Sequence, residues 1–313
     1  MNMVHINGAM LQAIEAEDRA GFEAALSAYK RLAAKSGFRN DGLAKDFGIL
    51  RTAAPEVAQA LAPQGRKGLA WLKRLAGDEM IDLRCLACLV VGEIGRGRPH
   101  DVVVLAHRLA ADDNWVVREI IANGLDDGLG PAQGDFLFDL MTRWARDPDA
   151  NVRRVPTNAL MRYGRHNPEE VVGLMRTLLR DDSGYVRKNV AFCLGIMGLA
   201  YHPTLGVKAP ERPRWLAGLL RKWTAESDER ARWIIAETLG RTWAKKCPAE
   251  ALGVMRLLAA DQRKRVRRQV VASLKSIAGH SPAEVRAVLK SWSHVADENV
   301  QALAREILRK GGL

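Results

Sequence analysis

The stretch DDNWVVREIIANGL (112–125) decides the fold, because its pattern returns along most of the chain. An acidic pair and a short turn lead into Val-Arg, which opens an apolar segment. The pattern returns in DPDANVRRVPTNAL (147–160), DDSGYVRKNVAFCL (181–194), SDERARWIIAETL (227–239) and DQRKRVRRQVVASL (261–274), with weaker copies at 78–90 and 297–308. The shared arginine stands at positions 84, 118, 153, 187, 232 and 267, at intervals of 34, 35, 34, 45 and 35. Such a fixed period predicts a repeat protein.

Each copy follows a second helical segment, such as PEEVVGLMRTLLR (168–180) or PAEALGVMRLLAA (248–260). Apolar residues in these segments recur at i, i+3, i+4 and i+7, which is one stripe of an α-helix. Proline opens several of them, and the acidic turn supplies N-caps for the helix that follows. A lone helix pair cannot bury both of its faces, so neighbouring pairs must stack. We therefore predict an all-α protein, an α-solenoid (superhelix) of HEAT-like helix-pair repeats.

The strength of the repeat along the chain predicts the domain organisation. Residues 1–66 repeat weakly and are predicted to form an N-terminal helical cap, and residues 67–313 to form one continuous repeat array. The 45-residue interval contains LAYHPTLGVKAPERPRW (199–215), whose prolines predict a loop insertion near 199–214. The insertion carries Lys208, Arg212 and Arg214, and both a functional loop and a neutral insertion remain open.

The charge and composition of the chain limit the partners and locations that we expect for it. The 313 residues carry a formal net charge of +12, and residues 208–310 hold 22 Lys and Arg against 11 Asp and Glu, or +11 of that total. This excess favours a polyanionic partner, above all nucleic acid, although a soluble protein with a basic end remains the alternative. The sequence shows no membrane-spanning segment, secretory signal or disulfide framework. We expect a cytoplasmic protein that associates with the bacterial nucleoid when it binds DNA.

The clustered basic residues open the second helix of each pair. For the first of them, at Arg118, Arg153 and Arg187, pairing with an inter-helix Asp of the adjacent repeat is the structural alternative to DNA contact. The second residue points about 100° away from the first, which favours phosphate contact. Basic residues hold this second position at Arg154, Lys188 and Arg268, whereas Glu119 and Trp233 replace them in two repeats.

Trp115 and Glu119 stand four residues apart and share a helix face. An indole attracts a cation through its ring face, and a neighbouring carboxylate adds an opposite charge. Such a pair could bind a cationic base and stabilise an oxocarbenium-like sugar while a glycosidic bond breaks. The alternative is a Trp packed in a groove and a Glu paired with Arg154. Asp126 and Asp127 follow on nearly the same stripe, where a solvated C-terminal turn before Gly128 is the structural interpretation.

The remaining motifs favour structural roles. Among the eight tryptophans, Trp215, Trp223, Trp233 and Trp243 cluster within the basic third, where indole can stack on bases, and Trp233 is a candidate DNA contact; most of them are expected to fill gaps between repeats. Cys85 and Cys88 form a C-x-x-C inside an apolar helix with no second such pair, so we predict no metal site. The glycines of GEIGRGR (92–98) follow no strand and indicate a helix end.

The stretch from about Ala111 to Leu252 resembles the HEAT-like-repeat alkylpurine DNA glycosylases of the AlkD and AlkC types. NWVVREIIANGL is similar to the AlkD-type segment in which a catalytic Asp follows a Trp by four residues, which implies Trp115 and Glu119 here. NVRRVPTNAL and YVRKNVAFCL resemble the next two repeats, implying Arg154 as a DNA contact and Phe192 as a second aromatic. VREIIANGLDD is also similar to an AlkC-type run, which would make Asp127 the catalytic carboxylate. Glu119 and Phe192 depart from the family's Asp and Trp.

The resemblance implies an enzyme that excises cationic N3- or N7-alkylated purines from duplex DNA, without flipping the base and without a metal or cofactor. We expect a monomer that holds double-stranded, damaged DNA in a basic concave groove. A DNA-binding module that does not cut and a protein-interaction scaffold are the rival interpretations.

Overall fold

The computed structural model describes residues 3–35, 47–199, 201–202 and 207–309, and nearly all of them lie in helices. The chain divides into two compact units, called here unit 1 (Met1–Tyr163) and unit 2 (Gly164–Leu313). Each unit consists of stacked helix pairs, so the predicted all-α array of HEAT-like repeats is confirmed. The separate cap over residues 1–66 stays a prediction.

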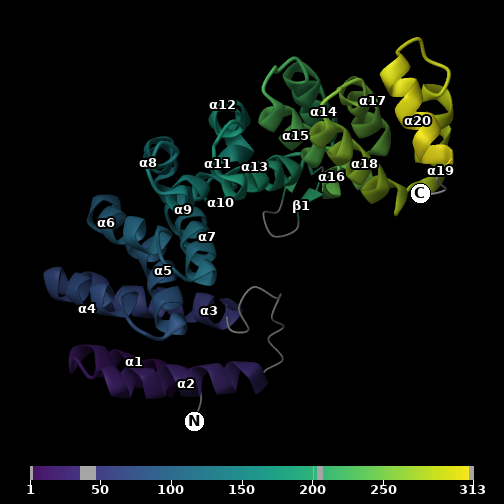
Figure 1. Ribbon diagram of the computed structural model, residues 1–313. Coiled ribbons are helices and arrows are strands. Elements are labelled where there is room, and N and C mark those ends of the chain that lie inside the picture. The colour runs from purple at the N-terminus through teal and green to yellow at the C-terminus, as the bar shows by residue number, and fades with distance from the viewer. Residues whose placement is uncertain (1–2, 36–46, 200, 203–206, 310–313) are drawn as a thin grey trace. The chain divides into compact units, whose positions relative to one another are not determined.

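Unit 1 stacks its helix pairs in chain order, as Figure 1 shows for α1–α2, α3–α4, α5–α6 and α7–α8. Helices α3, α5, α7 and α10 pack side by side in a row, and α4, α6 and α8 pair with members of this row. The elements are α1 (Met3–Glu15), α2 (Arg19–Lys35), α3 (Phe47–Leu61), the 3-10 helix η1 (Ala62–Gln64), α4 (Arg66–Ala76), α5 (Ile81–Gly95), α6 (Pro99–Ala110), α7 (Trp115–Ala132), α8 (Gly134–Trp144), α9 (Ala150–Arg154) and α10 (Pro156–Ala159), with α11 (Tyr163–His166) at the unit boundary.

Helices α5 and α7 approach each other most closely at glycines. A Cβ atom placed on Gly92 would lie 2.0 Å from the carbonyl oxygen of Gly124, and one on Gly128 would lie 2.2 Å from the carbonyl carbon of Gly92. Only glycine permits this backbone approach. The contact also explains why α7 continues past Gly128 to Ala132, so the predicted turn at that glycine is wrong.

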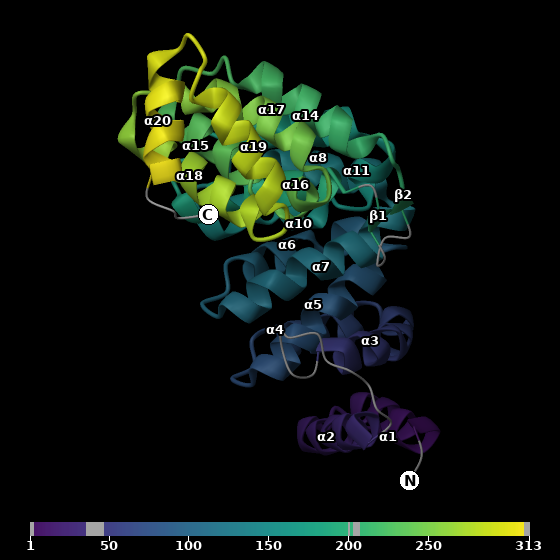
Figure 2. The same ribbon diagram turned by 90° about the vertical axis from the view of Figure 1, so that its right-hand side faces the viewer.

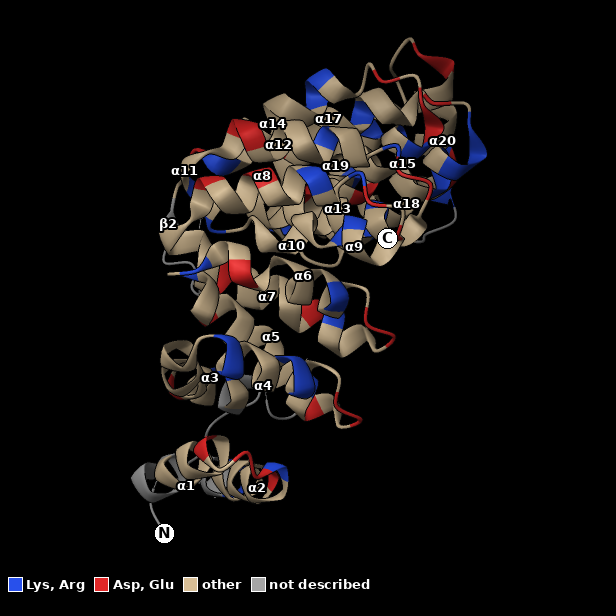
Figure 3. Cartoon of the chain, turned by 90° about the vertical axis from the view of Figure 1, so that its left-hand side faces the viewer, with Lys and Arg blue, Asp and Glu red and all other residues tan. Residues whose placement is uncertain are grey.

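The recurring Asp and Arg of the repeat fasten the loop between paired helices. In the loop before α7, Asp112 accepts the backbone N–H of Asn114 at 2.8 Å. Arg118 then donates from Nη1 to the carbonyl oxygens of Asp112 and Asp113, at 2.6 and 2.9 Å. Arg84, Arg153 and Arg187 bond the carbonyls five and six residues before them in the same way. The loops that follow α4 and α6 are red in Figure 3 because they carry these acidic residues.

The DNA contact predicted for Arg118, Arg153 and Arg187 stays a prediction, and the structure shows the three side chains bonded to the loops before their helices. The alternative, pairing with an Asp of the adjacent repeat, is observed for Arg84 with Asp112 at 2.9 Å and for Arg232 with Asp261 at 2.5 Å. These arginines therefore help to hold the repeats together.

Unit 2 repeats the arrangement with α13, α15 and α18 side by side. Figure 2 shows α14, α17 and α19 lying next to one another on this unit, in agreement with their packing contacts. The elements are α12 (Pro168–Leu178), α13 (Gly184–Met197), β1 (Tyr201–His202), β2 (Val207–Lys208), α14 (Arg212–Trp223), α15 (Glu229–Thr238), α16 (Thr242–Lys246), α17 (Pro248–Ala259), α18 (Lys264–Ala278), α19 (Pro282–Trp292) and α20 (Glu298–Arg309).

Two local features differ from the sequence-based expectation. The apolar helix expected over 147–160 is broken into α9 and α10, because Pro156 has no N–H to continue the helical hydrogen bonds. Within the predicted insertion, Tyr201 and His202 pair antiparallel with Lys208 and Val207, and residues 203–206 lie outside the described part of the chain. Helix α14 already begins at Arg212, inside the predicted loop, with a proline in its first turn.

Most of the tryptophans, and the cysteines of the C-x-x-C motif, lie in the apolar core. Five of the eight tryptophans are buried, as expected: Trp71, Trp144, Trp223, Trp243 and Trp292. Cys85 and Cys88 are buried in α5, and burial raises the pKa of Cys85 to about 12. Within the described ranges no helix combines the length and apolar character needed to cross a bilayer, and no group of His, Cys, Asp and Glu suits a metal ion.

Candidate nucleic-acid interface

Trp115 is the first residue of α7, and the cap of this helix positions it. The side chain of Asn114 accepts the backbone N–H of Val116 at 2.8 Å, which fixes the start of the helix. Trp115 is 53% exposed, which is unusual for so large an apolar side chain. Glu119 lies one turn further along, and its side chain is only 14% exposed. The indole is therefore open to a partner, whereas the carboxylate is recessed.

The carboxylate of Glu119 is held by two residues of the next repeat. One oxygen is ion-paired with Arg154, and the other accepts Nδ2 of Asn158 at 2.7 Å. The side chain of Arg154 is only 5% exposed, so its guanidinium faces Glu119 rather than solvent. The pairing with Glu119, which was weighed as the alternative for Arg154, is observed, and the predicted phosphate contact of Arg154 stays a prediction. The two partners fix the orientation of the Glu119 carboxylate.

Asp126 and Asp127 lie on α7 near its C-terminal end. Asp126 is 6% exposed and accepts the backbone N–H of Arg162 at 2.8 Å; burial raises the pKa of Asp126 to about 7, although hydrogen bonding and the charge of Arg162 oppose the shift. Asp127 is ion-paired with Arg162 at 2.5 Å and with Arg51 at 2.7 Å. Both carboxylates are thus tied into the fold, and the solvated turn expected there is wrong.

In unit 2, α13 presents an exposed stripe that includes two of the predicted DNA contacts. Lys188 is exposed, and Phe192 is 43% exposed. Tyr185, which the sequence analysis did not single out, is 38% exposed and lies at i, i+3 and i+7 with them, on one helix face. The convergence of Phe192 on Trp115 and Glu119 stays a prediction.

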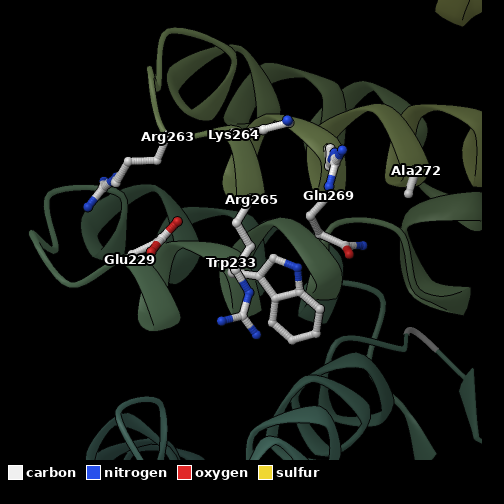
Figure 4. Close-up of a pocket in the computed structure, with 8 residues that line it drawn as sticks. Glu229, Trp233, Arg263, Lys264, Arg265, Gln269 and Ala272 are labelled. Atoms are coloured by element: carbon white, nitrogen blue, oxygen red, sulfur yellow. The ribbon is translucent and has the colours of Figure 1, made fainter.

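The other predicted contacts of unit 2, Trp233 and Arg268, line a pocket of about 760 Å³ between α15 and α18. Figure 4 shows the indole of Trp233 and the side chains of Arg265 and Gln269 reaching into the same space. Cζ of Arg265 lies 5.2 Å from the centre of the Trp233 ring, which is cation–π geometry. The full lining is Glu229, Trp233, Arg263, Lys264, Arg265, Arg268, Gln269 and Ala272.

The sequence analysis missed Lys264, Arg265 and Gln269 at this pocket. The run KRVRR (264–268) was the available signal, because it places four basic residues in the first turns of one helix. Only Arg268 was chosen from it, since that position matches Arg154 and Lys188 in the repeat. Burial lowers the pKa of Arg187, and the charges of Arg265 and Arg230 lower it further. The charges of Asp181 and Asp182 oppose this shift.

No protein-family model matches the sequence, and no curated protein matches it. Among solved structures, the chain is similar to AlkD2 from Streptococcus mutans, at 18% identity and a TM-score of 0.49, over 67% of this chain and 95% of that one. It is also similar to smu.31 from Streptococcus mutans UA159, at 16% identity and a TM-score of 0.45, over 72% of this chain and 96% of that one.

Proposed function

We propose that the protein is a DNA-repair protein of the alkylpurine DNA glycosylase kind. It binds duplex DNA and hydrolyses the N-glycosidic bond of a purine made cationic by N3 or N7 alkylation. The observation that carries the proposal is the pairing of an exposed indole, Trp115, with a carboxylate held in place by its neighbours, Glu119, on one face of α7. The basic surfaces of unit 2 supply the charge that duplex DNA requires.

The roles follow from the chemistry of each group. Trp115 stacks on the alkylated base and attracts its positive charge through the ring face. Glu119 stabilises the sugar cation as the bond to the base breaks, and it orients the attacking water. Arg154 and Asn158 act as positioning residues for Glu119. Lys188 and Arg268, which are exposed, contact DNA phosphates, and Phe192 flanks the lesion.

A second function, binding of alkylated DNA without cleavage, is favoured by the same ion pair. Arg154 offsets the negative charge of Glu119, so less of that charge is available to stabilise a cation. The glycosylase and the binder differ only in whether the recessed carboxylate reaches the sugar, and they share the DNA surface.

Base release from a methylated duplex tests the proposal. We expect the wild-type protein to release methylated purines, and we expect Trp115→Leu and Glu119→Gln each to slow release by roughly a hundredfold. Asp127→Asn covers the alternative carboxylate, and Asp139→Asn, at an exposed position of α8, is the matched control. Circular dichroism at the assay temperature checks that each variant is folded.

The outcomes separate the candidates. If the wild type releases no base but binds the methylated duplex more tightly than the unmodified one, the protein is the binder. If release occurs and survives Glu119→Gln but not Asp127→Asn, the catalytic carboxylate is Asp127. If the protein neither releases base nor binds duplex DNA, both functions are wrong and an interaction scaffold remains.

A further inference from the structure

The pocket between α15 and α18 is separate in its chemistry from the Trp115–Glu119 pair. We infer that unit 2 carries a site for an unpaired nucleic-acid strand, with a base against Trp233 and flanking phosphates on Lys264 and Arg268. The inference does not depend on any reaction at Glu119, and it assigns Arg268, which the proposed function places on duplex phosphates, to an unpaired strand.

The first support is the uncompensated positive charge. Among the described residues, no ion pair is formed by Lys264, Arg265 or Arg268, whereas Arg263 is bound to Asp261 at 2.7 Å. Glu229 is the single acidic residue of the pocket lining. The N-terminus of α18 carries these cations with no acid in its first turn and no side-chain cap. Cations at this positive end of a helix dipole repel one another and the dipole, which an anionic ligand would relieve.

The second support is that the positive charges near the pocket act on a residue of the neighbouring helix α13. The buried guanidinium of Arg187 on α13 has its pKa lowered by burial and by the charges of Arg265 and Arg230. Arg230 is ion-paired with Asp182 at 2.5 Å, and the side chain of Asp182 is 90% exposed. Such an exposed carboxylate neutralises the positive charge weakly because water screens it.

The aromatic and amide groups distinguish a nucleotide from a bare anion. Trp233 offers a ring in the pocket, and Gln269 on α18 offers an amide that can donate and accept hydrogen bonds (Figure 4). Bases stack on indole with little dependence on sequence. On the adjacent α13, the exposed rings of Tyr185 and Phe192 flank Lys188. Rings alternating with cations are the pattern of proteins that bind single strands.

An unpaired strand fits better than a duplex because paired bases are already stacked and cover their faces. A duplex could use the cations of α18 but would leave the Trp233 ring and the Gln269 amide unused. The inference therefore predicts a preference for flexible strands with bases over both duplexes and base-free strands.

Fluorescence anisotropy with labelled oligonucleotides of about 20 nucleotides tests this preference. The probes are oligo-dT, a blunt duplex of equal length, and an abasic strand that has the same phosphates and no bases. The variants are Trp233→Leu, Arg265→Gln and Arg268→Gln in the full chain. Arg256→Gln, an exposed residue of α17 in the same unit, is the control with an equal change of charge.

We expect oligo-dT to bind the wild type at least tenfold more tightly than the abasic strand. Trp233→Leu should weaken oligo-dT binding roughly tenfold without changing its salt dependence, because it removes stacking and no charge. Arg268→Gln should weaken binding and reduce the slope of log affinity against log salt by about 0.7. Arg256→Gln should bind as the wild type does.

Equal affinity for oligo-dT and the abasic strand would overturn the inference, as would oligo-dT binding that Trp233→Leu leaves unchanged. Tighter binding of the duplex than of oligo-dT would also overturn it and assign the pocket to the duplex. Glu119→Gln should leave oligo-dT binding unchanged, so loss of base release in that variant bears on the proposed function alone.

Discussion

Glu119 and Arg154, 35 residues apart in sequence, form an ion pair in which both side chains are largely withdrawn from water. They occupy the same position in consecutive repeats, directly after the arginine that fastens the loop. The repeat therefore places opposite charges side by side on neighbouring helices. The same geometry that makes Glu119 a fixed carboxylate makes it depend on Arg154.

Replacing one partner of this pair should destabilise the protein. Glu119→Gln leaves the buried guanidinium of Arg154 without its counter-charge, and we expect a loss of about 3 kcal/mol in the free energy of unfolding. The double variant Glu119→Gln/Arg154→Met should recover much of that loss, because no charge then remains buried. Urea denaturation of the single and double variants measures this. Additive losses in the double variant would contradict the coupling.

The glycine contact between α5 and α7 gives a second stability prediction. A methyl group at Gly92 would meet the carbonyl oxygen of Gly124 at 2.0 Å, so Gly92→Ala should force the helices apart and cost about 1–3 kcal/mol. The matched control is Gly173→Ala in α12, where no atom lies within 4 Å of the new methyl group. That variant should be neutral or stabilised by up to about 1 kcal/mol, since alanine favours the helix. Thermal melts compare the two.

Asp126 predicts a pH dependence of stability. Because burial raises the pKa of Asp126 to about 7, the folded protein retains a proton that the unfolded chain releases near pH 4. This group therefore makes the protein less stable as pH rises from about 4 to 7, and its effect is constant above that range. Asp126→Asn keeps the acceptor for the backbone N–H of Arg162 and removes the charge.

We expect Asp126→Asn to stabilise the protein more at pH 8 than at pH 5, by roughly 1–3 kcal/mol between the two conditions. Chemical denaturation of wild type and variant at both pH values provides the comparison. A stability difference that stays the same at pH 5 and pH 8 would show that Asp126 is ionised throughout.

Variants at a loop arginine and at the exposed Lys188 should affect different properties. The first should lower the stability of the fold, and the second should lower the affinity for DNA. Arg153→Met removes the bonds to the carbonyls of Asp147 and Pro148, both at 2.9 Å, and should cost about 2 kcal/mol of stability. It should change duplex affinity less than threefold. Lys188→Gln should leave stability within about 0.5 kcal/mol but weaken duplex binding and reduce the salt slope by about 0.9. If Arg153→Met instead weakened duplex binding and Lys188→Gln instead lowered stability, this division of roles would be wrong.

The sequence was sufficient for the architecture because the repeat is periodic in both charge and apolar pattern. It also placed Trp115 and Glu119 on one helix face, which follows from their spacing alone. It could not show whether the Arg154 side chain faces solvent or a neighbouring helix, because that depends on how adjacent repeats pack. Two helices differ from the expectation for local reasons: Pro156 splits the helix expected within 147–160, and Gly128 serves a close contact instead of a helix end.

The pocket of unit 2 shows the other limit of the sequence analysis. Arg265 and Gln269 contribute to it only because α15 and α18 lie side by side, and neither occupies a position that the repeat marks as special. The basic run was visible in the sequence, but which of its residues share a space with Trp233 follows from the helix packing.

Because Arg118 ties down the very loop that leads into its own helix, that fastening is internal to one module of the array. Gain or loss of a whole helix pair would leave the internal ties of the modules on either side unbroken, and only the ion pairs that bridge repeats, such as that of Arg84 with Asp112, would have to form anew. The length of the chain can therefore change in steps of one module.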